Sequence, residues 1–143
     1  MVYAGSDPKT AITAARAADV CIVVGATDSM ESKDRTNLSL NGDNDQLIAV
    51  VAKTNPHTVA VVRGPGAVVM PWIDLVGSAL FVGLAGQEAG SALASVLFGE
   101  VNPGGKLTLS FPKTMNDTWL SVYPGGPVNP EQYPVCSLKD TER

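Results

Sequence analysis

The sequence predicts an α/β fold: a three-layer sandwich with a mostly parallel sheet and helices on both of its faces. Two observations predict it. Short apolar runs rich in β-branched residues alternate along the chain with segments whose apolar residues repeat at helical spacing. This alternation is typical of parallel strands joined by right-handed helical crossovers. The chain has 143 residues, 45% of them hydrophobic and 17% charged, which suits one globular domain.

Four strands are predicted, over residues 20–24, 58–62, 79–82 and 107–111. The first is a continuous apolar run that ends at Gly25, and such a run is typical of a strand buried on both faces. Four strands are few for a sheet of this class, and nothing before the first helix completes it. We therefore expect a sheet truncated at its N-terminal side, with an open edge that a missing strand or a second copy in a homodimer would cover.

Three helices are predicted. The first begins at Ser6-Asp7-Pro8, a capping side chain followed by proline, and reaches about residue 18. The second stops at Asn55-Pro56, and the third opens at residues 86–88 and is capped by Gly99. Residues 67–74 are predicted to be a short helix or a loop. The residues expected to face inward are Ile12, Ala15, Ala18, Leu47, Ile48, Val51, Ala92, Leu93, Val96 and Leu97.

Proline, glycine and charged residues dominate the end of the chain. We therefore expect the domain to cover residues 1–118, and residues 119–143 to form a loop and tail. Cys21 lies in an apolar run and is expected to be a small buried hydrophobe. With Cys136 it defines no disulfide framework, so the compartment stays undetermined. The sequons that begin at Asn37 and Asn116 are compatible with secretion.

Charge and composition exclude several classes of partner. The net charge is −4 and the pI is about 4.8, without a run of lysine and arginine, so no nucleic-acid partner is expected. No apolar run approaches the roughly 20 residues that cross a bilayer, so no membrane partner is expected. The single histidine, His57, has no second ligand at a useful spacing, so no metal site is predicted. Neutral substrates fit this charge balance best.

Ligands of open parallel sheets bind at the carboxyl ends of the strands. Three loops leave such ends, and the longest and most charged covers residues 26–44. In it Asp28, Glu31 and Asp34 lie three residues apart, with Lys33 and Arg35 between and after them. A carboxylic acid can protonate a leaving group when its surroundings keep it protonated. From spacing alone, however, a charged loop is more often a solvated surface than a site.

The remaining candidates are weaker. No serine or cysteine lies in a nucleophile-elbow pattern beside His57, so a catalytic triad is not predicted. Glu88 falls in the first turn of a predicted helix, where the helix dipole already explains a carboxylate. The glycine-rich segments 64–66 and 83–86 lack the Walker lysine pattern. No cofactor is therefore expected.

Several motifs together resemble the second domain of family 3 glycoside hydrolases of the β-glucosidase type. Their order and spacing match that family over residues 14–118. Each motif alone is weak evidence, but so many motifs in the same order and spacing are specific. The motifs are Ala17-Ala18-Asp19-Val20, Glu31-Ser32-Lys33-Asp34-Arg35, Gln46-Leu47-Ile48, Asn55-Pro56-His57-Thr58-Val59, Met70-Pro71-Trp72, Gly86-Gln87-Glu88-Ala89-Gly90, residues 97–107 and Phe111-Pro112.

The resemblance implies that Glu31 is the general acid/base of a retaining β-glycosidase, with Asp34 and Arg35 supporting its loop. It also implies two partners: a β-glucoside or related oligosaccharide, and an N-terminal barrel domain, absent from this chain, that carries the nucleophile. The isolated chain is then expected to be inactive. Ser32 stands where the family usually has glycine, which could change how the loop bends. Residues 41–45 depart from a common Leu-Pro-Gly turn.

A second hypothesis from another class is a non-catalytic α/β module, used for carbohydrate binding or for assembly. It follows from the incomplete sheet edge, which favours association by strand pairing. Activity on an aryl β-glucoside, or its absence, separates an active chain from an inactive fragment or module.

Overall fold

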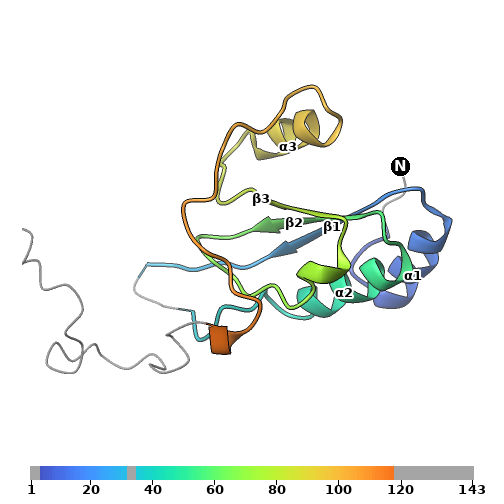
Figure 1. Cartoon of the computed structure of the whole chain (residues 1–143), viewed down its shortest axis with the longest axis horizontal. Helices are drawn as coiled ribbons and strands as arrows, with labels where there is room; N and C mark the ends of the chain where they lie inside the picture. The colour runs from blue at the N-terminus through green and yellow to red at the C-terminus, as the bar shows by residue number, and fades with distance from the viewer. Residues whose placement is uncertain (1–3, 32–34, 118–143) are drawn as a thin grey trace, which may run out of the picture.

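The computed structural model describes residues 4–31 and 35–117. Within them the chain alternates helices with three strands, which confirms the predicted α/β class (Figure 1). The elements are α1 (Pro8–Ala17), β1 (Cys21–Ala26), α2 (Asn44–Thr54), β2 (Thr58–Arg63), the short 3-10 helix η1 (Ile73–Leu75), β3 (Ser78–Phe81), α3 (Ala89–Leu97) and the short 3-10 helix η2 (Met115–Asp117).

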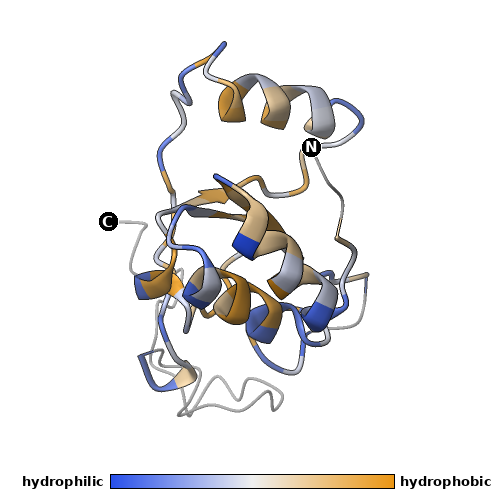
Figure 2. Cartoon of the chain, turned by 90° about the vertical axis from the view of Figure 1, so that its right-hand side faces the viewer, coloured by the Kyte–Doolittle hydropathy of each residue, from blue (hydrophilic) through white to orange (hydrophobic). Residues whose placement is uncertain are grey.

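The three strands form one parallel sheet in the order β1-β2-β3. Val23 pairs with Ala60, and Ala60 pairs with Ala79, so the carboxyl ends of the strands meet at one edge. Helices α1 and α2 lie against one face of the sheet, and α3 lies on the other side (Figures 1 and 2). The arrangement has helices on both sides of a parallel sheet, as predicted.

The hydrophobic core lies between the sheet and the helices α1 and α2. Leu47, Ile48 and Val51 are buried on α2, as their helical spacing predicted. On α1 the prediction was partly wrong: Ala15 is buried, but Ile12 is half-buried and Ala18 is exposed. Ala11 is buried instead, four residues before Ala15 on the same face of α1, and Ala18 lies beyond the last residue of the helix, Ala17. The buried Cys21 also joins this core, and its burial raises the pKa of the thiol.

The start of α1 follows its predicted cap. The Asp7 carboxylate accepts hydrogen bonds from the Thr10 amide at 2.8 Å and the Thr10 hydroxyl at 2.6 Å. These bonds favour the charged form, so they hold the pKa of Asp7 below its ordinary value of 3.8. At the other end, Asn55 donates from its side chain to the carbonyl groups of Ala15 and Ala18, at 3.1 and 2.7 Å. The C-terminal end of α1 is thereby tied to the end of α2.

The expectation that the first strand is buried on both faces was wrong. Residues 21 and 23 of β1 are buried, but Ile22 is 43% exposed and Val24 is 49% exposed. The physical reason is that, of the described elements, only α3 lies on their side of the sheet, and α3 contains no buried residue. Its predicted inward face is only half-buried at Leu93, Val96 and Leu97, and Ala92 is exposed.

The predicted fourth strand was also wrong. In the described part of the chain, residues 107–111 belong to no strand, and Leu107 is 65% exposed. The chain after α3 passes the carboxyl ends of the strands (Figure 1). Phe111 packs edge to face on Phe81, with ring centroids 4.8 Å apart, and the Met70 amide donates to the Pro112 carbonyl at 2.9 Å. These contacts hold the segment near the end of β3, so it does not run alongside that strand. Residues 67–72 form a loop that leads into η1, one of the two alternatives predicted for this stretch.

Candidate active site

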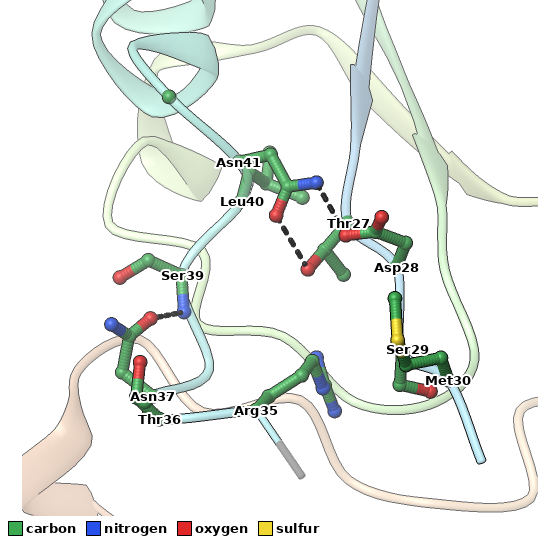
Figure 3. A pocket seen from close by; sticks show the side chains of 11 residues that line it. Thr27, Asp28, Ser29, Met30, Arg35, Thr36, Asn37, Ser39, Leu40 and Asn41 are labelled. Carbon is green, nitrogen blue, oxygen red and sulfur yellow. Dashed lines mark hydrogen bonds between the residues drawn. The ribbon is translucent and has the colours of Figure 1, made fainter. Parts of the chain in front are cut away.

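A long loop, residues 27–43, leaves the carboxyl end of β1 and returns to α2. Its outgoing arm, residues 27–31, and its return arm, residues 35–43, enclose a pocket of about 440 Å³ (Figure 3). Residues 27–30 line one side of the pocket, and residues 35–37 and 39–42 line the other. The loop predicted to carry the chemistry therefore does border a hollow at the ligand-binding edge of the sheet.

Asn41 joins the two arms at the root of the loop. Its backbone amide donates to the Ala26 carbonyl at 2.8 Å, and its side-chain amide donates to Asp28 Oδ1 at 2.7 Å. The Thr27 hydroxyl donates to Asn41 Oδ1 at 3.2 Å. Figure 3 shows the Asn41 side chain on the return arm, facing Thr27 and Asp28 on the outgoing arm.

The return arm is anchored in the core. Leu40 is buried, and its amide donates to Asp45 Oδ2 at 3.1 Å. The other oxygen of Asp45 accepts the indole N–H of buried Trp72 at 2.7 Å. A Cβ added at Gly25 would lie 2.6 Å from Leu40 Cδ1, so the absence of a side chain there makes room for Leu40.

Arg35 connects the loop to the segment after β2. One terminal nitrogen, Nη2, donates to the Ala67 carbonyl at 3.0 Å. The other, Nη1, is buried and has no hydrogen-bond partner among the described residues. The side chain also lines the pocket (Figure 3). Because it bonds to Ala67, Arg35 holds the return arm against the loop that follows β2.

Glu31 is the last described residue of the outgoing arm, and it is exposed. It is not among the residues that line the pocket, and among the described residues it forms no ion pair. Asp34, the third predicted site residue, lies outside the described residues. The structure therefore puts Glu31 and Arg35 on opposite arms of one loop.

The sequence did not identify the residues that shape this loop: Thr27, Asn41, Asp45 and Trp72. The only signals were the unusual polar run at 41–45 and the motif Met70-Pro71-Trp72, and neither gave a contact partner. Among the described residues, no group of three or more His, Cys, Asp or Glu side chains is placed to hold a metal ion. Among the helices that the structure describes, none is long and apolar enough to cross a bilayer.

Comparison with known proteins gives consistent matches. Residues 4–136 match the glycosyl hydrolase family 3 C-terminal domain. The thermostable beta-glucosidase B of Acetivibrio thermocellus is 44% identical over 117 residues, which are 78% of this chain and 15% of that protein. A beta-glucosidase of Rhizobium radiobacter is 39% identical over 124 residues, covering 80% of this chain and 15% of the relative.

Solved structures agree with these matches. DesR, a beta-glucosidase from Streptomyces venezuelae solved in complex with D-glucose, superposes with a TM-score of 0.72 at 41% identity, over 75% of this chain and 14% of that one. The chain thus spans about one seventh of the length of these relatives. The family match covers most of the chain and the fold agrees with it, so this chain belongs to the glycosyl hydrolase family 3 C-terminal domain family.

Proposed function

We propose that this chain is the second-domain part of a retaining β-glycosidase, β-glucosidase-like in its substrate, and that Glu31 is its general acid/base. The observation that carries the proposal is the position of Glu31: an exposed carboxylate on the outgoing arm of a loop rooted at the carboxyl end of β1. Ligands of open parallel sheets bind at that edge. The substrate class is supported by the names of the relatives, which are beta-glucosidases.

The proposed reaction uses Glu31 twice. In the first step its carboxylic acid protonates the glycosidic oxygen while a carboxylate on the N-terminal barrel attacks the anomeric carbon and forms a glycosyl ester. The bond between the anomeric carbon and the glycosidic oxygen breaks, and the aglycone leaves as an alcohol. In the second step the Glu31 carboxylate takes a proton from water, which attacks the anomeric carbon and releases the sugar with retained configuration. We assign no nucleophile within this chain and expect the isolated chain to give no turnover.

Arg35 and Asp34 are proposed to support the loop and not to react. For Arg35 the support is its bond to the Ala67 carbonyl, which would keep the return arm against the segment after β2. For Asp34 the proposal depends on the motif alone. A guanidinium with one nitrogen still unpaired has a donor left for a carboxylate of the same motif.

Azide rescue tests the proposal. A hybrid enzyme is made in which residues 4–136 replace the matching stretch of the Acetivibrio thermocellus relative. With Glu31→Ala, the glycosyl ester should accumulate on a dinitrophenyl β-glucoside, because no base activates water. Azide needs no base, so it should accelerate turnover and yield the β-glucosyl azide.

Glu88→Ala is the matched control, because Glu88 is also an exposed carboxylate and was the weaker candidate. It should show neither the loss nor the rescue. Formation of the α-glucosyl azide by the Glu31 variant would make Glu31 the nucleophile, and no azide effect would exclude it from both roles.

A second proposal concerns assembly, and exposed apolar side chains on β1 favour it. In β1, Ile22 and Val24 are 43% and 49% exposed, Val20 just before the strand is 58% exposed, and β1 is an edge strand of the described sheet. Such an edge pairs readily with another chain, so we propose a homodimer formed through β1.

Light scattering after gel filtration checks this proposal. The wild-type chain should give the mass of a dimer at micromolar concentration, and Val24→Lys should shift it to the mass of a monomer. Lys53→Glu, a charge change at an exposed position of α2, is the control and should remain dimeric. A wild-type chain that is monomeric at all concentrations would contradict the proposal.

A further inference from the structure

A single exposed side chain closes the root of the Glu31 loop. Asn41 bonds to three consecutive residues of the outgoing chain: the Ala26 carbonyl, the Thr27 hydroxyl and the Asp28 carboxylate. Glu31 follows only three residues after Asp28. We propose that Asn41 is a positioning residue, which fixes the direction in which the outgoing arm leaves the sheet and thereby aims Glu31. This inference rests on the proposed role of Glu31.

The chemistry of the two side-chain partners, Thr27 and Asp28, allows only one orientation of the Asn41 side-chain amide. An ionised carboxylate can only accept, so the side chain of Asp28 requires the NH2 group of Asn41. The Asn41 oxygen must then face Thr27, and the Thr27 hydroxyl must donate to it. A bond to an ionised acceptor is stronger than one between neutral groups, so the bond to Asp28 sets the geometry of the pair.

The root is also tied to the next strand. The Thr27 amide donates to the carbonyl of Arg63, the last residue of β2, at 2.9 Å. A Cβ added at Gly64 would lie 2.9 Å from the Thr27 methyl carbon, so Thr27 packs closely against that turn. Thr27 is 5% exposed. Asn41 thus acts on a residue whose own position is fixed by the sheet, and this gives the outgoing arm a rigid origin.

The Asn41 contacts are separate from those that stabilise the fold. The return arm is held in the core by Leu40, Asp45 and Trp72, and none of them bonds to the Asn41 side chain. Asn41 itself is exposed and belongs to no core cluster. Loss of its side-chain bonds should therefore loosen the loop between Asp28 and Asn41, which are 13 positions apart, without unfolding the domain.

The pair of residues 28 and 41 offers a swap experiment. Asn41→Asp keeps an oxygen for Thr27 but turns a second oxygen toward the Asp28 carboxylate, where two acceptors with like charge repel each other. Asp28→Asn alone keeps an oxygen for the Asn41 amide and serves as the control. The double variant Asp28→Asn/Asn41→Asp reverses donor and acceptor and should restore the bond.

Amide exchange measured by NMR on the 143-residue chain reads the root directly. The amides of Thr27 and residue 41 both donate across the root, and the amide of Ile48 in α2 is the reference. In Asn41→Asp the two root amides should exchange about tenfold faster, the effect of losing one charge-assisted hydrogen bond, with Ile48 unchanged. The double variant should return to the wild-type rate. The inference is overturned if the exchange rates of the two root amides do not change in Asn41→Asp. It is also overturned if Ile48 exchanges faster as well and the double variant does not restore the wild-type rates.

Kinetics of the hybrid enzyme supply the second readout. If Asn41 aims the acid, Asn41→Asp should lower kcat/KM on cellobiose about tenfold, leave kcat/KM on a dinitrophenyl β-glucoside nearly unchanged, and recover in the double variant. Equal losses on both substrates would mean a merely structural role. If Glu31→Gln lowers kcat/KM equally on cellobiose and on the dinitrophenyl β-glucoside, the proposed function fails. If Glu31→Gln lowers it mainly on cellobiose but Asn41→Asp does not, only the inference about Asn41 fails.

Discussion

Glu31→Gln in the hybrid enzyme should lower kcat/KM on cellobiose by about 10² to 10⁴-fold, the usual contribution of a positioned general acid. The amide keeps the shape of the side chain but cannot donate a proton to the glycosidic oxygen. A dinitrophenolate leaves without protonation, so kcat/KM on the dinitrophenyl β-glucoside should stay within a few-fold of wild type. Steady-state kinetics on the two substrates measure the difference.

Glu88→Gln is the control for this prediction, because Glu88 is an exposed carboxylate whose side chain bonds, among the described residues, only to Gln87 and Ser91. It should affect both substrates little. If Glu31→Gln lowers kcat/KM equally on both substrates, its role is binding or structure and not proton donation.

Trp72→Ala should destabilise the chain by about 3–5 kcal/mol, the usual cost of truncating a buried aromatic residue. Trp72 is 1% exposed and belongs to the core beside the base of the loop. Its indole N–H is also one of the two donors that hold Asp45, so the alanine variant leaves an unfilled volume and a carboxylate oxygen without its partner. Urea unfolding followed by circular dichroism gives the change in free energy.

Trp72→Phe separates the two contributions. It keeps most of the ring volume and removes only the bond to Asp45, so it should cost about 1.5–3 kcal/mol, the range for a hydrogen bond to a charged group. Truncation of a buried core side chain usually costs at least about 2 kcal/mol. If the free energy of unfolding of Trp72→Ala lies within about 1 kcal/mol of wild type, Trp72 does not stabilise the core.

The local elements could be predicted because their signals are local. The cap at Asp7, the spacing of Leu47, Ile48 and Val51, and the β-branched runs of β1 and β2 depend on neighbours within a few residues. What failed depends on packing partners far along the chain. The run 107–111 has the composition of a strand, but pairing needs a neighbouring edge along its whole length, and the segment meets only the end of β3.

The candidate site divides in the same way. Glu31 and Arg35 were found through a motif of five adjacent residues. The contacts that shape the loop join residues 13 apart for Asn41 and Asp28, 27 apart for Trp72 and Asp45, and 32 apart for Arg35 and Ala67. No periodicity or composition encodes such pairs, because each depends on how the strands and helices first pack.

The most direct test of the central claim is a crystal structure of the hybrid enzyme with glucose bound, in which the distance between the Glu31 carboxyl group and the nucleophilic carboxylate of the barrel is measured. Retaining chemistry predicts a separation of about 5–5.5 Å across the anomeric carbon. A Glu31 side chain directed away from the barrel, with another carboxylic acid at that distance from the nucleophile, would contradict the claim.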